Sequence, residues 1–160
     1  AVRRLRSAVS RRVTLMDDTP YIPPTGPNSA PAPSREIYAS MGEANIFRML
    51  ADFYAELGHS PIRAMFPEDL RVSSEKSAAF FVGLLGGPPL YQQRYGAPMM
   101  RARHLPFPID EAARQAWLDC WEPVLTRATS DYNFPSAHLE GFRAFLVGFS
   151  GWMVNRRSLE

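Results

Sequence analysis

Apolar side chains recur every three or four positions from residue 34 onward, and this spacing constrains the possible folds more than any other feature. One such stripe comprises Ile46, Leu50, Phe53, Tyr54 and Leu57. Spacings of three and four place side chains on one face of an α-helix, whereas a half-buried strand needs strict alternation, which we do not find. We therefore predict an all-helical domain over residues 34–160.

Capping and breaking residues divide this pattern into separate helices. The pair Ser40 and Glu43 has the spacing of a capping box, which predicts a helix start at that point. Ser73 or Ser74 predicts the next start, and the run Gly86-Gly87-Pro88-Pro89 predicts the end of that second helix.

Prolines and a carboxylate mark the later helices. Pro98 suits the first turn of a short helix that ends near His104. Asp110 predicts the start of a longer helix, which Pro123 should kink or end. The final helix is expected to open at Pro135 and to carry apolar residues at the same spacing.

Length and charge exclude several classes of protein. The 160 residues leave room for one domain, and no apolar run approaches the ~18 residues of a membrane span. Basic and acidic residues number 18 and 16, and the chain after residue 33 is slightly acidic, which argues against nucleic-acid binding. The single cysteine cannot form an internal disulfide and fits a reducing compartment, so we expect a cytoplasmic location. We also expect a monomer or a homodimer.

Residues 1–33 differ from the rest of the chain. They hold five Arg and two Asp, and six prolines fall between Pro20 and Pro33. Proline lacks a backbone donor and favours extended, solvated chain, so we predict a flexible extension. Its basic start superficially resembles a transit peptide. An over-long gene start, with Met16 as the true initiator, is the alternative.

Few residues support chemistry. No nucleophile has an evident base partner, and the glycine pair before Pro88 lacks the lysine of a phosphate-binding loop. The three histidines, His59, His104 and His138, are too far apart for metal-ligand spacing. Haem needs only one protein ligand, because the porphyrin supplies four nitrogens, and helical bundles can enclose such a disc. On composition alone, a lone histidine is more often a structural hydrogen-bonding group than a metal ligand.

Three segments together identify a family. They are Phe80-Phe81-x-x-Leu84-Leu85-Gly86-Gly87-Pro88-Pro89-Leu90-Tyr91, Arg101-Ala102-Arg103-His104-Leu105-Pro106-Phe107-Pro108-Ile109, and Trp117-Leu118-x-Cys120. With them the chain resembles the truncated haemoglobins of group II, over about residues 37–155. The resemblance implies a two-over-two helical sandwich around haem b.

The resemblance also implies roles for individual residues. His104 would be the proximal ligand of the iron, and its second ring nitrogen should donate to a backbone carbonyl near Met100. Tyr54 and Trp117 would line the opposite, distal pocket, with Ser77 above the iron. The remaining haem contacts would be Phe66, Ser73 (the gate position), Phe80, Phe81, Tyr91, Arg94, Met100, Arg103, Phe107 and Ile109. Met41 and Pro123 depart from the family pattern, which affects local geometry.

The implied function is the binding of O₂, NO or CO at ferrous iron, with slow release of oxygen. Such a protein could detoxify NO or peroxide with an external reductase, or it could bind or sense O₂, NO or sulfide without turnover. A globin-like interaction module that has lost haem is a third possibility, against which the retention of His104 argues.

Overall fold

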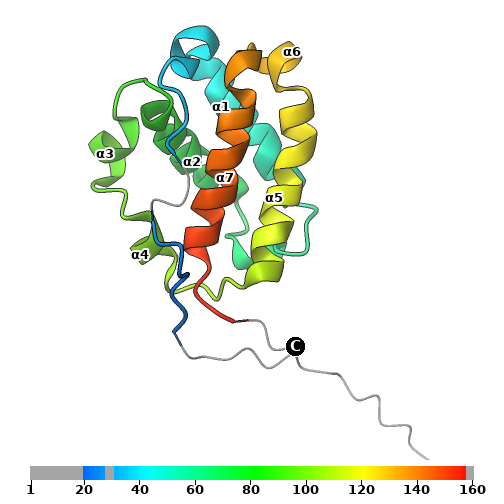
Figure 1. Cartoon of the computed structure of the whole chain (residues 1–160). Helices are drawn as coiled ribbons and strands as arrows, with labels where there is room; N and C mark the ends of the chain where they lie inside the picture. The colour runs from blue at the N-terminus through cyan, green and yellow to red at the C-terminus, as the bar shows by residue number, and fades with distance from the viewer. Residues whose placement is uncertain (1–19, 28–30, 158–160) are drawn as a thin grey trace, which may run out of the picture.

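The computed structural model describes residues 20–27 and 31–157, and within them it contains helices and no strands (Figure 1). The α-helices are α1 (Ile37–Leu57), α2 (Leu70–Leu84), α3 (Leu90–Tyr95), α4 (Met100–His104), α5 (Glu111–Thr126), α6 (Ala128–Tyr132) and α7 (Leu139–Met153). Two short 3₁₀ helices, η1 (Arg63–Met65) and η2 (Ser136–His138), join them. The predicted all-helical domain is confirmed.

The four long helices form two pairs that pack together. α1 packs on α2, α5 packs on α7, and α1 also contacts α5, which joins the pairs (Figure 1). The short helices α3 and α4 lie to one side, where α3 contacts α2 and α4 contacts α7. This arrangement leaves α4, which ends at His104, facing the interior surfaces of the longer helices.

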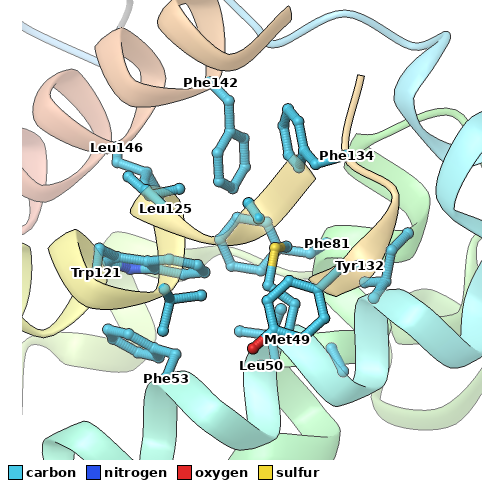
Figure 2. Close-up of a cluster of buried hydrophobic side chains, with 14 of the residues drawn as sticks. Met49, Leu50, Phe53, Phe81, Trp121, Leu125, Tyr132, Phe134, Phe142 and Leu146 are labelled. Atoms are coloured by element: carbon cyan, nitrogen blue, oxygen red, sulfur yellow. The ribbon is translucent and has the colours of Figure 1, made fainter. Parts of the chain in front are cut away.

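Buried apolar side chains from both helix pairs form the core (Figure 2). The ring of Trp121 stacks on Phe53, with centroids 4.3 Å apart and planes 18° apart. Phe142 of α7 packs against the edge of the same indole at 5.7 Å. Because these aromatic side chains come from α1, α5 and α7, their burial fixes the three helices relative to one another.

The start of α1 differs from the prediction. The helix begins at Ile37, before Ser40, and no Ser40–Glu43 capping hydrogen bond is present among the described residues. Gly42 has φ 77° and ψ 165°, which breaks the helix between the two predicted capping residues. A positive φ is easily adopted only by glycine. The helix therefore breaks at Gly42 and not at its neighbour Met41.

The predicted start of α2 is also wrong. The carboxylate of Asp69 accepts a hydrogen bond from the backbone N–H of Arg71 at 3.0 Å, so the helix begins at Leu70 and not at Ser73 or Ser74. Leu70 packs against the core, and this burial favours the earlier start. The predicted end is confirmed, because the helix stops at Leu84, just before the glycine pair.

The prolines have different effects from those expected. Pro98 precedes α4 by two residues instead of lying in its first turn, whereas the helix ends at His104 as predicted. Asp110 caps α5, accepting from the N–H of Ala113 at 2.8 Å, as expected. Pro123 lies inside α5, which continues to Thr126. Pro123 is exposed, so water can satisfy the carbonyl that loses its helical partner.

Part of the predicted flexible extension lies outside the described residues, as does Met16. Within residues 20–27, Tyr21 donates its backbone N–H to the carbonyl of Asn155 at 3.3 Å. Pro23 and Pro33 are buried against the helical domain. In the part of the chain that the structure describes, no helix is long and apolar enough to cross a membrane.

Candidate functional site

A cavity of about 380 Å³ lies between the helix pairs and α4. Side chains from α1, α2, α3, α4, α5 and α7 line it. The predicted site residues that line it are Tyr54, Phe66, Ser73, Ser77, Phe80, Phe81, Tyr91, Met100, Arg103, His104, Phe107, Ile109 and Trp117. Its volume is within the range usual for a ligand pocket.

His104, the last residue of α4, is held in one orientation at this cavity. Its Nδ1 lies 2.6 Å from the backbone carbonyl oxygen of Met100, one helical turn earlier. Because a carbonyl oxygen only accepts, Nδ1 carries the hydrogen in this contact, and in the neutral ring Nε2 then has the lone pair. The hydrogen bond expected from the sequence is therefore present, and Nε2 is the nitrogen available to a metal.

Tyr54 and Ser77 form a hydrogen-bonded pair in the wall of the cavity. The phenol oxygen of Tyr54 and Oγ of Ser77 are 2.6 Å apart, across the contact between α1 and α2. Burial raises the pKa of Tyr54, an effect that the hydrogen bond to Ser77 partly opposes. The phenol therefore stays neutral at pH 7 and keeps a proton that it can donate.

Trp117 lines the cavity from α5. Its ring stands edge-on to Phe53, with centroids 5.6 Å apart, and it lies 6.1 Å from Trp121. An indole N–H can only donate, so Trp117 can offer one hydrogen bond to a ligand that accepts it.

Cations lie at the cavity and beside it. Arg103 is exposed, donates to the carbonyls of Tyr95 at 3.0 Å and Ala97 at 2.8 Å, and stacks over the ring of Tyr91 at 5.4 Å. Lys76 stacks over the ring of Tyr95 at 5.4 Å. Arg94 is exposed on α3 and is not among the lining residues, unlike the other predicted haem contacts.

Aromatic rings make up much of the remaining wall. Phe66 meets the edge of Tyr54 at 6.0 Å, and Phe80 lies 5.9 Å from Phe149 of α7. Flat, apolar surfaces of this kind suit a planar organic ring system, and an aqueous ion would gain nothing from them.

Some lining residues were not predicted. They are Met65, Pro67, Lys76, Ala113, Arg114, Phe149, Ser150 and Met153. The spacing of Phe149 and Met153 placed them on the inner face of the last helix, but it could not distinguish a cavity wall from the core. Local sequence patterns could not predict that Arg114 lines the cavity, because its place depends on a tertiary contact. Its guanidinium donates to Oγ of Ser150, in α7, at 3.1 Å.

Comparison with known proteins decides the family. Residues 36–149 match the bacterial-like globin family. The chain belongs to the bacterial-like globins. It is 39% identical over 89 residues to group 2 truncated hemoglobin YjbI of Bacillus subtilis, an alignment that covers 55% of this chain and 67% of that protein.

Solved structures agree with this family assignment. Phosphate-bound Hell's gate globin IV superposes on this globin with a TM-score of 0.73 at 36% identity, over 81% of each chain. The truncated oxygen-avid haemoglobin from Bacillus subtilis gives a TM-score of 0.67 at 34% identity, over 74% of this chain and 98% of that one. The resemblance to group II truncated haemoglobins and the predicted two-over-two fold are confirmed.

Family membership implies haem, and the cavity of this globin fits that group. One wall offers a single imidazole with an available Nε2. Tyr54 and Trp117, each of which carries one polar hydrogen on its side chain, line the same space. Aromatic side chains flank the space, and Arg103 lines it with a charge that suits a carboxylate. A globin binds small gaseous ligands through haem, so the coarse functional prediction is confirmed.

Proposed function

We propose that this globin holds haem b with His104 as the protein ligand of the iron. The observation that carries the proposal is the 2.6 Å contact between His104 Nδ1 and the carbonyl of Met100. In the neutral ring, this contact places the hydrogen on Nδ1 and leaves Nε2 as the nitrogen that would coordinate the iron. When bound, haem would supply a ferrous iron that takes up diatomic gases and passes electron density to them.

In this proposal the chain's polar side chains determine how long a gas stays. Tyr54 is positioned by Ser77, and it can donate its hydroxyl hydrogen into the cavity, as Trp117 can donate its indole N–H. A hydrogen bond to a partly charged acceptor is worth roughly 1.5–3 kcal/mol. Two such bonds would slow release by about 10² to 10⁴.

The porphyrin edges and carboxylates would meet the remaining predicted residues. We propose Phe66, Phe80, Phe81, Phe107 and Ile109 as apolar contacts. Tyr91 and Arg103 would face the propionates, and Ser73 would occupy the gate position. Arg94 could reach a propionate only by a change of side-chain conformation, because it does not line the cavity. We also propose a cytoplasmic location, in line with the reduced Cys120.

Replacing the proposed iron ligand tests the haem site. The full chain, expressed with ample haem, should be red and show a Soret band. His104→Ala should lose haem or hold it weakly, because the cavity then offers no imidazole. The control is His59→Ala, since His59 is exposed and does not line the cavity. Unchanged haem content and spectra in His104→Ala would remove the assignment.

Gas release tests the polar wall. We expect a Tyr54→Phe, Trp117→Phe double variant to release dioxygen about 10²- to 10⁴-fold faster in stopped-flow displacement, because both donors are lost. Tyr38→Phe serves as the control, since Tyr38 packs near Gly87 and does not line the cavity. Equal release rates in the double variant and the unchanged protein would end this part of the proposal.

Tight retention suits ligand chemistry better than bulk transport. One relative is described as oxygen-avid, and we propose the same property here. The catalytic form of the proposal is NO or peroxide detoxification with an external reductase, and the other form is binding or sensing without turnover. Repeated consumption of NO in the presence of dioxygen and a reductase would favour the catalytic form, and consumption of a single equivalent would favour the binding form.

A further inference from the structure

Helix α4, which carries His104, cannot fix its own position. It spans only Met100–His104, and no side chain caps its N-terminus. Met99, which precedes it, has the left-handed φ of 36° that costs energy outside glycine. Isolated helices shorter than about 12–15 residues are marginal in water. The place of the imidazole must therefore be set by contacts between α4 and the rest of the chain.

Arg101, one turn before His104, provides the largest set of such contacts. Its guanidinium donates to the carbonyls of Val154 at 2.9 Å and Tyr21 at 2.9 Å, and also to the carbonyl of Trp152. It lies over the indole ring of Trp152 at 4.6 Å. Several donors in a rigid plane suit several carbonyls at once, so Arg101 ties α4 to the segment at Tyr21 and to the chain at the end of α7.

Asn155 holds the turn that follows His104. Its side chain donates to the carbonyl of His104 at 3.3 Å and to that of Phe107 at 2.9 Å, and it accepts from the N–H of Ile109 at 2.9 Å. Asn155 is only 1% exposed, so these bonds have little competition from water. The turn is therefore fixed to the chain just beyond α7.

Tyr21 connects the N-terminal segment to the same two residues. Its backbone N–H donates to the carbonyl of Asn155 at 3.3 Å, while its own carbonyl accepts from Arg101. Arg157 lies over the Tyr21 ring at 5.2 Å. Figure 1 shows this blue segment passing the end of α7, where the red C-terminal segment begins.

We infer that Arg101 and Asn155 are positioning residues for His104, and that the N-terminal segment at Tyr21 is coupled through them to the iron ligand. This inference rests on the proposed function, in which His104 Nε2 binds the iron. Neither side chain touches the proposed site of the porphyrin, since neither lines the cavity. They act on α4 and on the turn after it, and so on the direction and freedom of the imidazole.

The test uses the full haem-loaded chain with Arg101→Gln, Asn155→Ala and Tyr21→Pro. The last removes the Tyr21 N–H donor and the ring beneath Arg157, and it keeps the carbonyl that accepts from Arg101. We measure the rate of haem loss to an excess of a haem-accepting protein and the iron–histidine stretching band of the ferrous form. Loss of a partner that orients a metal ligand typically costs 10- to 100-fold in affinity. We expect haem loss to accelerate about 10- to 100-fold in the first two variants, with a shifted or broadened band, and less in Tyr21→Pro.

A matched control and a conservative variant separate positioning from folding. Arg48 also lies over an aromatic ring, Tyr132 at 5.5 Å, and donates to a backbone carbonyl, that of Asp131, but at the α1–α6 contact. Arg48→Gln should therefore leave both readouts unchanged. Arg101→Lys keeps the positive charge but replaces the planar guanidinium with a single ammonium group. Its iron–histidine band and its rate of haem loss should therefore fall between those of the unchanged protein and Arg101→Gln.

The outcomes separate the inference from the proposed function. If His104→Ala keeps the iron–histidine band, the proposed function is wrong and the inference falls with it. If that band is lost in His104→Ala while Arg101→Gln and Asn155→Ala match Arg48→Gln in both readouts, only the inference is overturned. If Arg101→Gln fails to fold, Arg101→Lys and Tyr21→Pro test the inference in its place. Unchanged haem-loss rates and iron–histidine bands in both variants would overturn the inference.

Discussion

The hydrogen bond between Tyr54 and Ser77 joins side chains 23 positions apart, at 2.6 Å. Periodicity alone placed Tyr54 on the inner face of its helix but could not distinguish a core tyrosine from one that faces a cavity. Its hydroxyl also needs a partner when buried, and Ser77 supplies one. That partner cannot be read from either local sequence, because it depends on how α1 crosses α2.

The titration of Tyr54 tests this pairing. Burial raises its pKa above the ordinary value of 10.0, so its contribution to stability is complete below pH 10 and declines as pH rises through the folded-state pKa. In Ser77→Ala the opposing hydrogen bond is lost, so we expect the pKa of Tyr54 to rise further. Tyrosinate absorbance followed against pH measures the pKa of Tyr54 in the unchanged protein and in Ser77→Ala.

Tyr54→Phe identifies the signal in that titration, because the Tyr54 step should disappear from the curve. The pKa of Tyr132 is also raised by burial, so its step should persist in Tyr54→Phe. A Tyr54 pKa that falls in Ser77→Ala would contradict the pairing.

The backbone geometry just after α2 requires glycine at position 86. Gly86 has φ 108°, and a Cβ there would lie 1.8 Å from the carbonyl oxygen of Arg35. The N–H of Gly87 donates to the carbonyl of Val82 at 2.8 Å, which closes the helix end. The glycine pair predicted the end of α2 correctly. Ser73 and Ser74 predicted its start wrongly, because Asp69 caps the helix earlier and the partly buried Leu70 is its first residue.

Gly86→Ala should lower the free energy of unfolding by about 2 kcal/mol or more, because the positive φ and the contact with Arg35 must both be relieved. Urea denaturation of the full chain measures the loss. Gly141→Ala is the control: Gly141 lies in α7 with nothing near the added Cβ, so it should stabilise by roughly 0.5–1 kcal/mol. Equal effects at the two positions would refute the packing argument.

Two neighbouring regions share the interior of this globin, a solid aromatic core and a cavity. Phe142 is fully buried and lies 5.2 Å from Phe134 and 5.8 Å from Phe81, in the core of Figure 2. Trp117 and Trp121, one turn apart on α5, mark the boundary, because the first lines the cavity and the second is buried in the core. The core fixes the helices that form the cavity.

Phe142→Ala should cost about 3–5 kcal/mol of unfolding free energy, because it leaves a void among three other aromatic rings. Val147→Ala on the same helix is the control, and its change should lie within about 0.5 kcal/mol, since Val147 is 46% exposed. Thermal and urea unfolding measure both variants. A Phe142→Ala loss as small as that of Val147→Ala would show that the core does not depend on this ring.

The sequence by itself determined the helical class, the family and three helix boundaries, namely the ends of α2 and α4 and the start of α5, because periodicity, caps, breakers and motifs are local properties of the chain. It also predicted the hydrogen bond of His104 to the carbonyl of Met100, since a helix brings residues four apart into contact. Only the tertiary structure placed Arg94 outside the cavity and joined Arg101 to Tyr21, 80 positions away. Such contacts depend on the packing of distant segments, and that packing is decided by the burial of the whole core.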